Sequence, residues 1–114
     1  MLSSIKRPTY AYIGETICIR DRLKQHNSGH GSLSTEPAYL RPFCVMAYIC
    51  GFNGEKTLRR FVEQKWKERR DVLIRNGIND VRQWAKCGND VIQHLNEGDN
   101  IFERCELRLI LLFR

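Results

Sequence analysis

One uninterrupted apolar run limits the folds open to this chain. The run from Phe43 to Cys50 carries no charge and lies between Pro42 and Gly51. It is short for a helix and rich in residues that favour strands, so it predicts a β-strand buried on both faces. Such a strand needs partner strands for its backbone groups and helices to cover its faces.

The rest of the chain alternates between strand-like and helix-like patterns that supply these partners. The order of the elements predicts an α+β fold with a small central antiparallel or mixed sheet flanked by helices, in one domain spanning residues 1–114. The first seven residues carry no clear pattern. The predicted elements are a strand at 9–13, a helix at 17–27, a loop at 28–41, the strand at 43–50, helices at 55–75 and 80–95, and a strand at 104–113.

Several residues mark the expected ends of these helices. Thr16 can cap the helix at 17–27, and Gly29 lies just past its end. Gly88 interrupts the pattern of the helix at 80–95, because glycine weakens a helix interior.

The charge of the chain leaves two classes of protein open. The formal net charge is +6 and the pI is about 9.3. A basic protein gains affinity for a polyanion when its cations neutralise phosphates and release counterions. A protein that is merely soluble and basic has the same composition, so charge alone favours neither.

The cysteines and the apolar segments indicate a compartment. The chain has five cysteines, an odd number, and no pair is spaced C-x-x-C, which argues against a structural zinc site or a disulfide framework. Free thiols in a reducing compartment are therefore expected. We find no signal-peptide pattern and no segment long enough to span a bilayer. We expect an intracellular protein, in the cytoplasm or nucleus, that is not secreted.

The most specific motif lies between Tyr12 and Gly29, where the sequence reads YIGETICIRDRLKQHNSG. Tyr-Ile-Gly ends a predicted strand, and the following helix carries Arg22 and His26. This block resembles the core of the GIY-YIG nuclease superfamily. The resemblance continues through the apolar strand to a helix that bears Glu63, and it covers residues 9–67.

The resemblance implies a metal-dependent DNA endonuclease that hydrolyses phosphodiester bonds with Mg²⁺ or Mn²⁺. A guanidinium presents a permanent charge and a planar fork to phosphate oxygens, so Arg22 is predicted to stabilise the transition state. Mg²⁺ keeps most of its waters and takes one or two carboxylates, so Glu63 is the predicted metal ligand. Tyr12, with Tyr10 and His26, is predicted to orient or activate the nucleophile.

Basic and polar residues near this block are the predicted nucleic-acid contacts, and each also has a simpler interpretation. Helical Lys and Arg residues usually face water, and Arg59 and Lys67 lie four residues from Glu63 on either side, as in surface ion pairs. The predicted contacts with DNA are Lys24, His30, Arg59 and Lys65.

Only the second of the family's two tripeptides is present. A G-I-Y strand is expected upstream of Tyr12, at or before Met1, and residues 2–5 do not supply it. Three explanations are open: the chain is truncated, Tyr10 replaces the missing tyrosine, or the strand at 104–113 pairs with the strand at 9–13 in its place.

Two functions other than catalysis stay open. The chain is either a nuclease, or a nucleic-acid-binding module of the same fold that has lost catalysis, or a protein-interaction domain whose charge aids solubility. An unpaired strand edge would favour a dimer. Residues 71–114 carry no motif that separates these alternatives.

Overall fold

A computed structural model describes residues 1–97 and 106–113 of the chain. This part of the chain confirms the predicted small α+β fold, with its strands arranged in two antiparallel sheets. The elements are β1 (Leu2–Ser4), β2 (Ala11–Tyr12), α1 (Ile19–Asn27), the 3-10 helix η1 (Ala38–Leu40), β3 (Phe43–Val45), β4 (Ala47–Cys50), α2 (Lys56–Arg75), α3 (Val81–Lys86), α4 (Gly88–Glu97) and β5 (Arg108–Leu111).

The strand position that we expected to be empty is filled by the start of the chain. β1 is the central strand of a three-stranded sheet with the order β2-β1-β3, and Leu2 lies opposite both Tyr12 and Val45. The expectation that residues 2–5 do not supply a strand upstream of Tyr12 was therefore wrong, although the letters G-I-Y are absent. The serines of this strand are polar, so the sequence does not show the apolar pattern of a buried strand. Ser4 can be buried because its hydroxyl donates a hydrogen bond to the Leu40 carbonyl.

The C-terminal strand does not take the place beside β2. β5 pairs with β4, and Ala47 lies opposite Leu111. The hypothesis that residues 104–113 pair with residues 9–13 was wrong, because β1 already occupies that edge of β2. The first two residues of the predicted strand, 104 and 105, lie outside the described residues.

The apolar run at residues 43–50 divides at Met46 into β3 and β4, which belong to different sheets. Burial alternates along β4: Ala47 and Ile49 are buried, whereas Tyr48 and Cys50 are half-buried. The prediction of a strand buried on both faces was therefore wrong. The buried residues contribute to the main core, and the residues between them point to a face that is only partly covered.

The helices begin and end close to the predicted residues. α1 starts at Ile19 without a side-chain cap, and the Thr16 hydroxyl accepts a hydrogen bond from the Cys18 amide before the helix, so the predicted Thr16 cap was wrong. Gly29 follows the end of α1 with φ 85°, a conformation that suits glycine. The helix predicted at 80–95 is divided between α3 and α4, which begins at Gly88.

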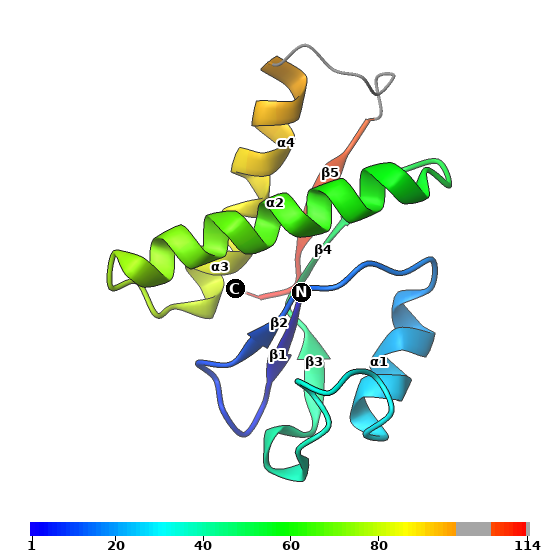
Figure 1. The fold of residues 1–114 in the computed structure, drawn as a ribbon, viewed down its shortest axis with the longest axis vertical. Helices are drawn as coiled ribbons and strands as arrows, with labels where there is room; N and C mark the ends of the chain where they lie inside the picture. The colour runs from blue at the N-terminus through cyan, green and yellow to red at the C-terminus, as the bar shows by residue number, and fades with distance from the viewer. Residues whose placement is uncertain (98–105, 114) are drawn as a thin grey trace.

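The longest helix, α2, contacts both halves of the molecule. Figure 1 shows it crossing between the three-stranded sheet with α1 on one side and α4 with β5 on the other. Its buried residues Leu58, Val62 and Trp66 join the main core together with residues of α3 and α4. The Trp66 indole donates a 2.9 Å hydrogen bond to the Trp84 carbonyl, which ties α2 to α3.

The four cysteines of the described part are free thiols, as expected, whereas Cys105 lies outside it. Cys87 is buried, and burial, followed by the nearby Asp90 carboxylate, raises the pKa of its thiol to about 11, so it is an inert core residue. Within residues 1–97 and 106–113, no helix is both long enough and apolar enough to cross a membrane.

Candidate active site

A cleft opens between β2, α1 and the first half of α2. Three predicted site residues from these three elements line it together: Tyr12, Arg22 and Glu63. Val62 and Trp66 are among the apolar residues that line it. The polar residues that face this cleft are Tyr12, Glu15, Thr16, Arg22, Tyr48, Arg59 and Glu63.

The Tyr12 ring is fixed between a glycine and a histidine. A Cβ on Gly14 would lie 2.7 Å from the Tyr12 ring. The Tyr12 side chain therefore packs over the backbone of residue 14, and only glycine leaves room for it there. The ring also packs against the His26 imidazole, with 4.5 Å between centroids. The Tyr-Ile-Gly sequence therefore holds the phenol beside the cleft through packing.

His26 lies behind Tyr12 and does not line the cleft. Its side chain is completely buried, and its Nδ1 lies 2.6 Å from the Thr35 hydroxyl oxygen. Burial, followed by the positive charge of Arg22, lowers the pKa of His26 from 6.5 to about 4, so the imidazole is neutral near pH 7. Within the described part of the chain, Nε2 has no hydrogen-bond partner. The geometry makes His26 a positioning residue for Tyr12.

Arg22 reaches the cleft from the first turn of α1. It is half-buried, and its Nη1 donates a 2.9 Å hydrogen bond to the Gln25 side chain. A guanidinium has five N–H donors, and this hydrogen bond uses one of them. The remaining donors can bind the oxygens of a phosphate in the cleft.

Two ion pairs control the charge of the cleft. Glu63 accepts a 2.8 Å hydrogen bond from Lys67, one turn further along α2. Glu15 accepts a 3.1 Å hydrogen bond from the Arg59 guanidinium, and the Arg59 side chain is only 10% exposed. Arg59, a predicted DNA contact, is thus mostly buried as the partner of Glu15.

The carboxylates of the cleft fit a weakly held hard cation. No group of three or more potential ligands among His, Cys, Asp and Glu gathers within residues 1–97 and 106–113. Mg²⁺, however, is commonly bound by one or two carboxylates together with waters and substrate phosphates. Glu63 is 22% exposed at its side chain and faces the cleft, so it suits this mode of binding.

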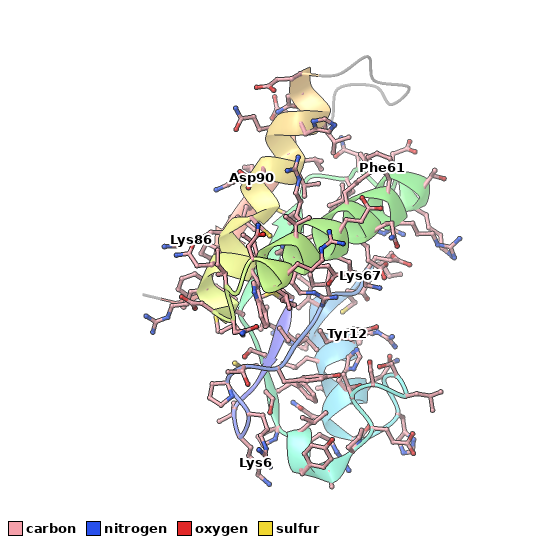
Figure 2. All side chains as sticks on the ribbon, turned by 60° about the vertical axis from the view of Figure 1, so that its left-hand side comes forward. Lys6, Tyr12, Phe61, Lys67, Lys86 and Asp90 are labelled. Atoms are coloured by element: carbon pink, nitrogen blue, oxygen red, sulfur yellow. The ribbon has the colours of Figure 1, made fainter. Side chains whose placement is uncertain are left out.

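The other predicted residues lie away from the cleft. The Tyr10 hydroxyl donates a 2.6 Å hydrogen bond to the Ser34 carbonyl, and this ring faces a neighbouring groove. Lys24 and His30 are exposed on α1 and in the loop that follows it. Lys65 pairs with Glu68 and extends over the Phe61 ring; Figure 2 shows Phe61 and Lys67 on opposite sides of α2.

Three polar residues of the cleft, Glu15, Thr16 and Tyr48, were not predicted as site residues, and Thr16 was interpreted only as a helix cap. Glu15 directly follows Tyr-Ile-Gly, and a carboxylate there was a signal that could have been used. Its partner Arg59 is 44 residues away, so the pair itself has no local signature. Tyr48 lies within the apolar run, where a phenol is indistinguishable from a packing residue.

The comparison with known proteins adds one finding to this geometry. Residues 1–79 match the family model of the GIY-YIG catalytic domain, and the match includes β1, α1 and all of α2. No curated protein and no solved structure matches the chain.

Proposed function

The chain belongs to the GIY-YIG catalytic-domain family, a family of nucleases, and from this premise we propose that it is a metal-dependent endonuclease that hydrolyses phosphodiester bonds in DNA. The observation that carries the proposal is the meeting of a phenol, a guanidinium and a carboxylate in one cleft. Tyr12, Arg22 and Glu63 come from a strand and two helices, and each lines the same cleft.

These three groups divide the work that phosphodiester hydrolysis requires. Arg22 binds the non-bridging phosphate oxygens and stabilises the charge that develops in the transition state. Tyr12 orients the attacking water and accepts its hydrogen bond, held in place by His26 and by the close approach of Gly14. The buried His26 acts through Tyr12 and has no contact with the cleft of its own.

Glu63 is the residue that would hold Mg²⁺ or Mn²⁺, which supplies charge neutralisation at the phosphate when it is bound. In the free protein the Lys67 ammonium occupies one oxygen of this carboxylate. Glu15 is the second carboxylate of the cleft, and its Oε2 is engaged by Arg59.

A specific observation favours a second candidate function, a nucleic-acid-binding module without catalysis. β1 contributes leucine and serine, so this strand brings no phenol to the cleft. Tyr10, which one of the three explanations puts in place of the missing tyrosine, faces the neighbouring groove. Catalysis therefore depends on Tyr12, and on Tyr48 if a second phenol is required.

Cleavage of supercoiled and branched DNA in Mg²⁺ or Mn²⁺ tests the proposal. Arg22→Ala and Glu63→Gln should each reduce the cleavage rate by a factor of about 100 or more. Matched controls are Arg20→Ala, an exposed residue of the same helix, and Glu68→Gln, on α2 away from the cleft. Both controls should cleave at the parental rate.

Metal binding can be measured without turnover. Mn²⁺ should raise the melting temperature of the parent, because a ligand that binds only the folded state stabilises it. Glu63→Gln should lose this shift, and Glu68→Gln should keep it. A parent that binds DNA but cuts none of these substrates would favour the binding module. A parent that neither binds nor cuts would refute both functions.

A further inference from the structure

A second hollow, the α2 groove, adjoins the cleft at Tyr12. It lies between β2 with its preceding turn and the second half of α2, and Tyr12 lines both hollows. Figure 2 shows Lys67 on the side of α2 that faces Tyr12. The α2 groove is lined mainly by Tyr10, Tyr12, Ser34, Lys67, Arg70 and Trp84.

One stripe of α2 forms a wall of both hollows. Arg59 and Glu63 line the cleft, and Lys67, Arg70 and Ile74 line the α2 groove. Successive members are three or four residues apart, which places them on one face of the helix. At a rise of about 1.5 Å per residue, Lys67 and Arg70 lie about 6 and 10 Å beyond Glu63 along the helix axis. The groove is therefore a continuation of the cleft.

The cations of the groove are available to an anionic ligand. Lys67 is held by Glu63 at 2.8 Å, and Arg70 donates one hydrogen bond to Asp71 at 3.2 Å. The side chain of Asp71 is 56% exposed, and exposed ion pairs contribute only about 0–1 kcal/mol. A phosphate can therefore replace Asp71 as the partner of Arg70, and the Lys67 side chain, which is 35% exposed, can be reached from the groove.

Two aromatic residues that also line the groove are fixed by hydrogen bonds. The Tyr10 hydroxyl donates a hydrogen bond to the Ser34 carbonyl, and the Trp84 indole donates one to the Ile78 carbonyl. A groove that carries two cations and has fixed side chains beside them complements a sugar–phosphate chain in charge.

We propose that the α2 groove binds the backbone of the DNA strand next to the phosphate in the cleft, with Lys67 and Arg70 as its phosphate contacts. This inference rests on the proposed function and extends it to the path of the substrate. When DNA binds, Lys67 transfers from Glu63 to a flanking phosphate, and the carboxylate is released toward the cleft. Arrival of the substrate and exposure of the metal ligand are thus a single event.

The salt dependence of DNA binding tests this path. The affinity of a short fluorescein-labelled DNA duplex is measured by anisotropy over a series of salt concentrations. Each lost phosphate contact should reduce the slope of log affinity against log salt by about 0.9. The double variant Lys67→Gln/Arg70→Gln should therefore lose about 1.8 from the slope. Lys67→Arg/Arg70→Lys should restore it, because both charges are kept.

The matched control removes two charges elsewhere. Lys6→Gln/Lys86→Gln changes the net charge equally, and Figure 2 shows both residues away from Lys67. If the groove and control variants have the same slope, the α2 groove is not the path, although the proposed function stands. If the parent itself shows no salt-dependent binding, the proposed function fails as well. Cooperative thermal unfolding of each variant confirms that it is folded.

Discussion

The imidazole of His26 packs on the ring of Tyr12 with 4.5 Å between the centroids and 52° between the ring planes. His26 is completely buried, whereas Tyr12 faces the cleft, so the contact joins the protein interior to the candidate reaction centre. Its consequence is that the position of the phenol depends on a residue that no substrate touches.

His26→Asn should therefore act on catalysis through Tyr12. Removing the ring leaves the phenol without support on one side, and we expect a fall in kcat of about tenfold with little change in KM, because misplacement of a reacting group slows the chemical step. Steady-state cleavage kinetics give both constants. His94→Asn, an exposed residue of α4 that lines neither the cleft nor the α2 groove, is the control and should leave both unchanged. An increase in KM alone would argue against a positioning role.

The stability of the protein should depend on pH through His26. Its pKa is about 4 in the folded protein and 6.5 in the unfolded chain, so the unfolded state binds more protons between these values. The contribution of His26 to stability is complete above pH 6.5 and falls as the pH drops toward 4, by on the order of 1–3 kcal/mol. Urea unfolding across this range measures the fall. His26→Asn should reduce it, and an undiminished pH dependence in this variant would assign it to other groups.

Gly14→Ala should displace the Tyr12 ring. The new Cβ would lie 2.7 Å from the Tyr12 ring, which is too close, so the ring must move. Because the ring already packs against His26, it cannot move toward that residue, and the phenol is displaced from its position at the cleft. We expect kcat to fall by about 10- to 100-fold, because a displacement on the order of 1 Å has that effect on an aligned group. DNA affinity should stay close to the parental value. An alanine variant with parental kcat would show that Tyr12 need not hold this position.

The ion pair between Glu15 and Arg59 should be energetically coupled. Their side chains are 22% and 10% exposed, so removing one partner leaves a poorly solvated charge on the other. A double-mutant cycle with Glu15→Gln and Arg59→Gln should give a coupling of about 1 kcal/mol in urea unfolding. The exposed pair Lys65–Glu68 provides the comparison and should give less than about 0.5 kcal/mol. Equal couplings would contradict a structural role for the cleft pair.

Residues 1–79 should not fold as an isolated fragment, although they match the family model. Trp66 is 4% exposed, and both its contact with Gly88 and its hydrogen bond to Trp84 come from beyond that boundary. Removing α3, α4 and β5 would uncover the core side of α2. We expect the fragment to lose cooperative thermal unfolding, measured by circular dichroism. A sharp transition close to the parental temperature would show that the C-terminal part is dispensable.

The helices and the first part of the site could be predicted because their signals are local. α2 shows apolar residues at helical spacing and ends at Arg75, two residues before Gly77, so its observed bounds differ from the predicted ones by one residue, at the start of the helix. Tyr12 and Arg22 belong to one short block, so its resemblance to the family motif already predicted them at one site, and both line the cleft.

The remaining features depend on packing between distant segments. β1 is a strand because its backbone pairs with β2 on one edge and with β3 on the other. The sequence Leu-Ser-Ser does not by itself indicate either pairing. Lys65 and Lys67 are two residues apart with the same charge, yet only Lys67 faces the α2 groove. Which of the two lysines faces the groove depends on how α2 packs against the rest of the protein. The charge of a lysine gives no information about this orientation.

The two tryptophans of the chain are divided between the two hollows, since Trp66 lines the cleft and Trp84 lines the α2 groove. The protein therefore carries an intrinsic fluorophore at each of the two places where a strand of DNA would lie. Trp84→Phe leaves Trp66, at the cleft, as the single tryptophan, and Trp66→Phe leaves Trp84, at the groove. The order in which a substrate fills the two hollows could thus be followed in real time by stopped-flow fluorescence, without attaching a dye.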